Sequence, residues 1–296
     1  MLVLWLFFGF IIGSIIGSLA QALAERSLKK VSFLGRSYCP KCKNAIRWYD
    51  LFPVLSYVLL KGRCRFCHQK IGVNYLWVEI FLGLLIAMLF GQSLTNSPPL
   101  GNQFKLTIFF YELVFKIYFI TVLAVVTLTD LKKNLIPDKV MIPAIIITFA
   151  SLVAVTVYKI WYLYYYLAGD SLGRFLLPPH NDYLKRHIVM IIEPIFWSIL
   201  LGIGIAGFFL LLIMLTRGKG MGGGDVKLGA FIGLGLGFPL ALLAVLLAFL
   251  SGAVVAVGLV IMGKKSFGQT IPFGPFLVLG SLTVLFWGNQ ILKLIF

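Results

Sequence analysis

The chain has 296 residues, of which 60% are hydrophobic and only 12% are charged, and its formal net charge is +16 at pH 7. This composition excludes a water-soluble globular protein and predicts an integral membrane protein. The positive charge does not indicate a nucleic-acid partner, because the Lys and Arg residues gather in loops between apolar runs.

Apolar runs long enough to cross a bilayer, about 20 residues, recur along the chain. We predict an all-α polytopic protein with about eight transmembrane helices: Leu2–Ala24, Tyr75–Gly91, Leu106–Thr129, Val140–Tyr158, Ile188–Thr216, Leu228–Met262 split at Gly237-Phe238-Pro239 into a short and a full helix, and Ile271–Ile291. The first run lacks a basic leading segment and a small-residue cleavage site, so we expect an uncleaved span instead of a signal peptide.

The distribution of Lys and Arg predicts the orientation in the membrane. The largest cluster lies between Arg26 and Lys70, and smaller ones surround Lys132, Lys219 and Lys264–Lys265, all on one side of the predicted spans. The positive-inside bias places this side in the cytoplasm and both termini outside. An outer loop carries the aromatic run Trp161–Tyr166, which is typical of a membrane interface. The lipid bilayer, with its anionic headgroups, is therefore the expected surroundings of the chain.

All four cysteines lie between the first two predicted spans, in the pairs Cys39/Cys42 and Cys64/Cys67. Two C-x-x-C pairs about twenty residues apart are typical of a structural zinc site with four thiolates. The cytoplasm keeps thiols reduced, and a segment this small gains stability from a metal. A redox pair or unused thiols are the alternatives, and His68 could take the place of one cysteine ligand.

Two aspartates, Asp130 and Asp225, lie where apolar runs meet Lys-bearing loops on the predicted cytoplasmic side. A carboxylate at the edge of hydrocarbon is unfavourable and therefore indicates a function. Two carboxylates close together share one proton, so that one can activate water while the other donates to a substrate carbonyl oxygen. This chemistry is that of an aspartic peptidase.

The residues beside the two aspartates add further candidates. Gly222–Gly224 directly precede Asp225, and we expect positive φ and a close approach of an extended substrate there. Lys227 is expected to tune the local charge. Asp138 follows Ile136-Pro137, and we expect it to begin the next helix or to be a third candidate for catalysis.

Eight short motifs follow one another in a specific order and spacing: Ser37-Tyr-Cys39-Pro40-Lys-Cys42, Ile46-Arg-Trp48-Tyr49-Asp50, Pro53-Val54-Leu55-Ser56-Tyr57, Gly62-Arg-Cys64-Arg-Phe-Cys67, Tyr75-Leu-Trp-Val-Glu79, Asp130 with Ile136-Pro137-Asp138, Gly222-Gly223-Gly224-Asp225-Val-Lys227, and Ile271-Pro272-Phe273-Gly274-Pro275. Together they resemble the motifs of the type IV prepilin peptidases, which are membrane aspartic proteases of bacteria. The resemblance covers most of the chain.

The resemblance implies that Asp130 and Asp225 are the catalytic pair. It implies cleavage of a short basic leader from prepilins and pseudopilins at the cytoplasmic face of the bacterial inner membrane. Relatives that keep the cysteine segment then methylate the new amino terminus with S-adenosylmethionine. The expected organisation is a first span at 1–24, a zinc module associated with methyl transfer at 25–74, and a peptidase domain at 75–296.

Some positions depart from the family pattern or allow two interpretations. Gln21 stands where the family has Asn, and Leu51-Phe52-Pro53 lacks the usual Asn, which makes methyl transfer less secure than cleavage. Glu79 could bind the substrate amino terminus or the methyl donor, or pair with a basic residue of the zinc module. A presenilin-like intramembrane protease and a proton-coupled transporter are the alternative functions.

Overall fold

The computed structural model describes residues 2–29, 31–33, 35–39, 41–95, 103–169, 173–177, 182–218, 222–263 and 272–295. Over these residues the chain is helical, and its β-structure is limited to isolated bridges between Tyr38 and Ala45 and between Arg63 and Lys70. Some residues named above lie outside the described ranges: Pro40, Lys219, Lys264, Lys265 and Ile271.

Among the described residues, seven helices are long and apolar enough to cross a membrane. They are α1 (Leu2–Leu28), α3 (Val73–Thr95), α4 (Gln103–Lys133), α5 (Asp138–Gly169), α6 (Tyr183–Leu215), α8 (Leu240–Ile261) and α9 (Gly274–Ile295). Each overlaps a predicted span, so the prediction of an all-α polytopic membrane protein is confirmed. The predicted short span corresponds to α7 (Gly223–Leu236), whose 14 residues extend about 21 Å.

Several helices extend beyond the predicted spans, and the extensions of α4 and α5 concern residues singled out above. Helix α4 continues to Lys133, so Asp130 lies within the helix and not in the loop after it. Lys side chains in a last helical turn are favourable, which accounts for the extension. Helix α5 continues to Gly169 and includes the aromatic run Trp161–Tyr166, so the prediction that this run lies in a loop is wrong. No Gly or Pro interrupts that run, and its rings stack along the helix at i and i+4.

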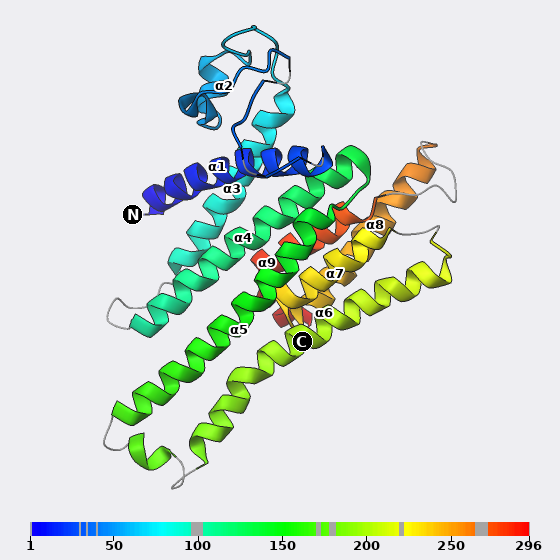
Figure 1. Ribbon diagram of the computed structural model, residues 1–296. Helices are drawn as coiled ribbons and strands as arrows, with labels where there is room; N and C mark the ends of the chain where they lie inside the picture. Colours follow the sequence, from blue (N-terminus) through cyan, green and yellow to red (C-terminus); the bar gives the residue numbers. More distant parts are fainter. Residues whose placement is uncertain are drawn as a thin grey trace. The chain divides into compact units, whose positions relative to one another are not determined.

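The chain forms two compact units, Met1–Lys133 and Asn134–Phe296. In the first unit, α1 packs against α3 (Figure 1). The contact is made through small residues of α1 that are spaced four apart. A Cβ atom added to Gly9 or Gly17 would lie 2.8 Å from the Cα atom of Ala87 or Glu79, respectively. Small residues of this kind let membrane helices approach to backbone contact. Helix α4 packs against the same helix α1.

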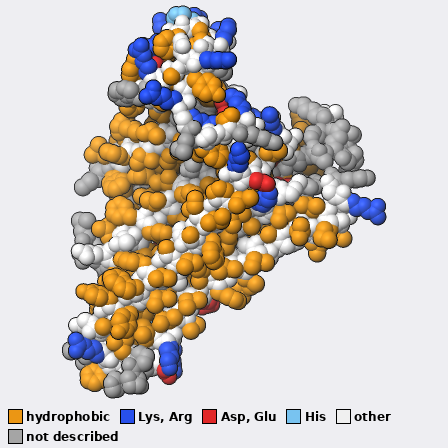
Figure 2. Space-filling view, viewed as in Figure 1, with side chains coloured by type: hydrophobic (Ala, Val, Ile, Leu, Met, Phe, Trp, Pro, Cys, Tyr) orange, Lys and Arg blue, Asp and Glu red, His pale blue; other side chains and the backbone are white. Residues whose placement is uncertain are grey.

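A small module interrupts the first unit between α1 and α3. It contains the 3₁₀ helix η1 (Trp48–Leu51) and the short helix α2 (Leu55–Leu59). In Figure 2, hydrophobic side chains cover the long helices, whereas Lys and Arg side chains gather on this module. An apolar surface of that extent indicates contact with lipid, and the basic module is the part that is suited to water and headgroups.

In the second unit, the short helix α7 is the centre of the packing. It contacts α5, α6, α8 and α9, and it is followed by a break at Gly237, where φ is +66°. A Cβ atom on Gly233 would lie 2.6 Å from the Cα atom of Gly202 on α6, so these two helices also meet at backbone distance. The predicted break at Gly237-Phe238-Pro239 is therefore confirmed, and the helix that carries Asp225 is enclosed by its neighbours. The remaining element of this unit is the 3₁₀ helix η2 (Gly173–Leu176).

Candidate functional site

The four cysteine sulfurs form one cluster in the module. The Sγ atoms of Cys39, Cys42, Cys64 and Cys67 all lie within 4.8 Å of one another, and those of Cys39 and Cys67 are 3.8 Å apart. A zinc ion with Zn–S bonds of about 2.3 Å holds its four sulfurs about 3.8 Å apart in a regular tetrahedron. The residues present therefore fit a four-thiolate metal centre.

The two C-x-x-C segments adopt the same backbone turn. In each, the N–H of the first cysteine donates to the carbonyl five residues later, at 3.0 Å for Cys39 and 2.9 Å for Cys64. The residue after the second cysteine has positive φ in both turns, +58° at Lys43 and +54° at His68. Because the two turns have the same conformation, each turn presents its two thiols to the cluster in the same way. His68 occupies the turn position, and the described ligand cluster consists of the four cysteines alone.

The environment of Cys39 favours its thiolate form. The backbone N–H groups of Cys42 and then Lys41 lower the pKa of Cys39 to about 6, and the residue is buried. Metal binding requires the thiolate, so these N–H groups prepare the first turn to bind a cation.

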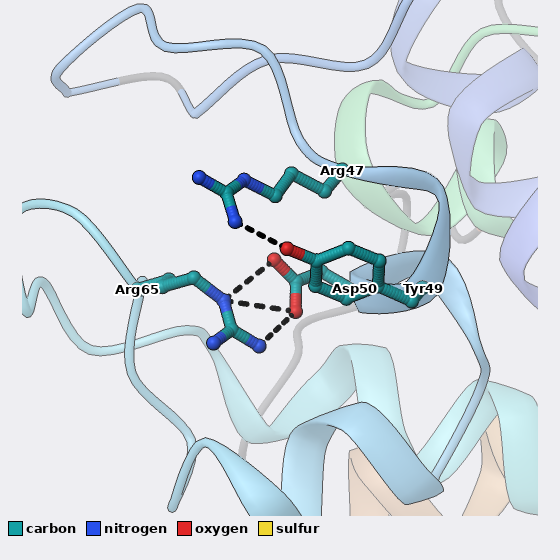
Figure 3. Close-up of polar contacts among 4 residues, drawn as sticks. All are labelled: Arg47, Tyr49, Asp50 and Arg65. Atoms are coloured by element: carbon teal, nitrogen blue, oxygen red, sulfur yellow. Dashed lines mark hydrogen bonds and ion pairs between the residues drawn. The ribbon is translucent and has the colours of Figure 1, made fainter.

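Four polar and aromatic residues tie η1 to the second cysteine turn (Figure 3). Arg65 donates to both carboxylate oxygens of Asp50, at 2.6 to 3.2 Å, and its guanidinium lies 5.3 Å from the ring centre of Tyr49. Arg47 donates to the Tyr49 hydroxyl and lies 5.6 Å from the ring centre of Phe66. Arg65 and Phe66 are the two residues inside the second C-x-x-C pair. These contacts therefore hold that turn in place by means other than the metal.

Glu79 connects α3 to the module. Its carboxylate accepts a 2.8 Å hydrogen bond from the backbone N–H of Val54. Val54 has φ +59° and ψ −54°, and the N–H of Leu55 donates to the carbonyl of Pro53, which defines a γ-turn of the rare positive-φ type. A β-branched residue is strained in this conformation, so the Glu79 carboxylate helps to retain a strained turn.

Asp130 lies near the carboxyl end of α4 and is buried, with 5% of its surface exposed. It continues a buried face of the helix that includes Phe119, Leu123 and Val126. Two residues later, the Nζ atom of Lys132 lies 3.6 Å from a carboxylate oxygen of Glu25, at the end of α1. The spacing of two residues places Lys132 and Asp130 on opposite sides of α4.

Asp225 lies in the first turn of α7 and is 8% exposed. Gly222 precedes the helix with φ −90° and ψ 154°, and none of Gly222–Gly224 has positive φ, so that expectation was wrong. The close approach occurs at Gly224, where an added Cβ atom would lie 2.7 Å from the Cβ atom of Ile136. The residue at position 224 must therefore lack a side chain because Ile136 of the same chain, and not a substrate, lies against it.

Asp138 and Lys227 form an ion pair in the same unit. Asp138 is the first residue of α5, as predicted, and Lys227 lies on α7 two residues after Asp225. The Asp138 side chain is 61% exposed, so water screens this pair. Together with the contact between Ile136 and Gly224, the pair fastens the segment 134–138 to the first turns of α7.

Comparison with known proteins identifies the family. The profile of the bacterial peptidase A24 N-terminal domain matches residues 11–93, and that of the type IV leader peptidase family matches residues 185–257. A prepilin leader peptidase/N-methyltransferase of Burkholderia pseudomallei (strain K96243) is 30% identical over 258 residues, which are 86% of this chain and 68% of the relative. The chain belongs to the prepilin leader peptidase family.

Other members of the prepilin leader peptidase family match over similar or greater lengths. A prepilin leader peptidase/N-methyltransferase of Bacillus subtilis (strain 168) is 28% identical over 293 residues, covering 99% of this chain and 97% of the relative. The protein of the same name from Aeromonas salmonicida is 29% identical over 261 residues, covering 87% and 73%. No solved structure matches this chain.

The two family profiles divide the candidate residues. The first profile includes the cysteines and Glu79, and the second includes Gly222–Gly224, Asp225 and Lys227. Asp130 and Asp138 lie between the two matched segments.

Sequence reasoning missed several contacts around these residues, notably those of Glu25, Val54 and Ile136. A signal for Glu25 was present, because it continues a series of inward-facing residues on α1 at intervals of four. Nothing in the sequence distinguishes the strained turn at Val54.

Proposed function

We propose that this protein is a membrane aspartic endopeptidase that removes the leader from type IV prepilins or pseudopilins. Family membership is the observation that carries the proposal, because the relatives are named prepilin leader peptidases over most of the chain. We propose that it acts in the bacterial inner membrane with its active site on the cytoplasmic face, where the Lys and Arg clusters of the loops are expected.

We propose Asp130 and Asp225 as the catalytic pair. Both carboxylates are buried, although most acidic groups stay in water unless they have a partner or a task. In the aspartic mechanism one carboxylate removes a proton from the attacking water, and the other gives its proton to the carbonyl oxygen of the scissile peptide bond. The two groups exchange protonation states as the tetrahedral intermediate collapses and the amine leaves.

The positions of the two aspartates in their helices suggest which one is the base and which one is the proton donor. The amino terminus of a helix carries partial positive charge and favours a carboxylate, and Asp225 lies in the first turn of α7. We therefore assign the base to Asp225. Asp130, near the opposite end of its helix, is assigned the proton donor. We propose that Gly224 lets the backbone before Asp225 pack closely against Ile136, and that Lys227 and Asp138 fix its position. An added Cβ atom on Gly222 would meet no atom within 4 Å, so Gly222 is assigned no packing role.

Substitution of the two aspartates tests the peptidase. Asp130→Asn and Asp225→Asn are each expected to reduce cleavage of a co-expressed prepilin by at least about 10⁴-fold, measured by the mobility shift of the processed pilin. Glu193→Gln makes the same kind of change, from a carboxylate to an amide, at a residue of α6 outside the proposed site. It is the matched control and should cleave normally. Undiminished cleavage in either Asn variant, with normal accumulation in the membrane, would remove that residue from the pair.

We further propose that the protein methylates the new amino terminus of the pilin. The relatives carry N-methyltransferase in their names, and the four thiols fit a structural zinc ion. S-adenosylmethionine would supply the methyl group to the free amine. The module's residues would hold the zinc through Cys39, Cys42, Cys64 and Cys67, and Glu79 would hold the module against α3, close to the amino terminus of the pilin.

Mass spectrometry of the mature pilin tests methyl transfer. With the parent protein, the mass of the amino-terminal peptide should increase by one CH₂ group, about 14 mass units. Cys39→Ser should abolish this increase while cleavage continues. An unmodified terminus from the parent protein would leave a peptidase without methyltransferase activity. Cleavage within the pilin helix, away from the leader junction, would instead favour a presenilin-like protease.

A further inference from the structure

A row of residues on α1 holds three helices of the first unit together. Gly9, Gly13, Gly17, Gln21 and Glu25 follow one another at intervals of four, slightly more than one helical turn, so they form a row that winds slowly around α1. The three glycines lie against the backbone of α3. One turn further, the Gln21 side chain donates a 2.9 Å hydrogen bond to a backbone carbonyl at the start of α3. Gln21, which departs from the family pattern, thus has a packing partner.

Glu25 ends this series with contacts to two other helices. Its carboxylate accepts a hydrogen bond from the Tyr75 hydroxyl on α3, and the Nζ atom of Lys132 on α4 lies 3.6 Å away. Lys132 also lies 5.9 Å from the ring centre of Tyr75. Lys29 makes a longer contact of 4.0 Å with Glu25. The carboxylate therefore joins the end of α1, the start of α3 and the end of α4.

The contact between Glu25 and Lys132 fixes the rotation of the last turn of α4. Residues two apart on a helix differ by about 200° around its axis, so Asp130 projects from the side opposite Lys132. Accordingly, the Lys132 side chain is 46% exposed, whereas Asp130 is 5% exposed.

We infer that Glu25 is a positioning residue for peptide cleavage, acting through Lys132 on the direction of Asp130. The inference rests on the proposed catalytic role of Asp130. Glu25 lies in the amino-terminal part of the chain, just before the cysteine module, yet its effect falls on the peptidase reaction. A displacement of about 1 Å in a reacting group lowers catalysis by about 100-fold, so a small change in α4 is sufficient to be measured.

Steady-state cleavage of a prepilin by purified protein in nanodiscs tests the inference. Glu25→Gln and Lys132→Gln are each expected to lower kcat by about 10- to 100-fold with little change in KM. Because both remove the same contact, the double variant should lose little more than either single variant. Lys132→Arg keeps the charge and should stay close to the parent. Lys133→Gln is the matched control, since it removes a neighbouring charge and leaves the Glu25 contact in place.

Two further measurements separate positioning from misfolding. The charge-swapped variant Glu25→Lys with Lys132→Glu should recover most of the lost kcat, and zinc content should be unchanged in all variants. If Asp130→Asn is inactive but Glu25→Gln and Lys132→Gln keep the parent kcat, the positioning role is overturned and the catalytic assignment stands. If Asp130→Asn keeps its activity, the proposed catalytic role of Asp130 has failed, and the positioning role that rests on it fails too. Equal losses in the charge-swapped and single variants would also contradict the inference.

Discussion

The candidate aspartates of the two units lie at opposite ends of their helices. In the first, Asp130 lies near the carboxyl end of the long helix α4, and in the second, Asp225 lies in the first turn of the short helix α7. In both, a lysine follows two residues later and is paired with a carboxylate from another segment, Lys132 with Glu25 and Lys227 with Asp138. In the long helix α4, the lysine contact determines the rotation of the last turn and hence the direction of Asp130. In the short helix α7, the lysine contact holds the first turn, and with it Asp225, against the segment 134–138.

The surroundings of the two pairs differ accordingly. Glu25 also binds the Tyr75 hydroxyl, and its side chain is 29% exposed, whereas that of Asp138 is 61% exposed. Exposed ion pairs contribute little to stability, so the second unit depends more on direct packing. That packing is the contact of Gly224 with Ile136 and the enclosure of α7 by its neighbours.

Apart from replacing the aspartates themselves, the largest effect is expected from crowding the first turn of α7. In Gly224→Ala the new Cβ atom would lie 2.7 Å from the Cβ atom of Ile136. Overpacking of this kind costs about 1–3 kcal/mol, and we expect kcat/KM for prepilin cleavage to fall by about 100-fold. Gly223→Ala is the matched control, because no atom lies within 4 Å of its added Cβ. Equal activities of the two variants would show that packing does not position Asp225.

A smaller effect is expected from the exposed ion pair. Asp138→Asn should lower kcat by about 3- to 10-fold, less than Glu25→Gln, because water already screens the contact with Lys227. Raising the salt concentration should reduce the difference between this variant and the parent. If Asp138→Asn is the more damaging of the two substitutions, the proposed contrast between the units is wrong.

The smallest effect on cleavage is expected from removing the metal. A zinc chelator should abolish methylation of the pilin terminus but change the cleavage rate by less than about threefold. The contacts among Glu25, Tyr75 and Lys132 involve no thiol group, so they should survive when the cysteine turns lose their ion. Metal content and both activities can be measured on one sample. Parallel loss of cleavage and methylation would show that the module positions Asp130 as well.

Sequence reasoning predicted what depends on local pattern. Run length located the spans, and the break at Gly237 located the end of α7. The spacing of the cysteine pairs predicted a cluster, which Cys39 and its three partners form. The end of α4 and the end of α5 were misplaced, because neither a pair of lysines nor a run of aromatic residues is enough to stop a helix.

Contacts between distant segments could not be predicted in the same way. Glu25 and Lys132 belong to different helices, and hydrophobic periodicity carries no information about which charges will meet. Gly224 was recognised as a place of close approach, but the neighbour was expected to be substrate and is Ile136. The strained turn at Val54 depends on the carboxylate of Glu79, which lies on α3, 25 residues further along the chain.

The hydrogen bond between Tyr75 and Glu25 brings together the points where the chain enters and leaves the cysteine module. The module is therefore an insertion in a helical hairpin, and its two ends are neighbours. A short turn joining α1 to α3 could replace the whole insertion without separating the helices. The architecture thus permits the cysteine module to be replaced while the hairpin beneath it stays the same.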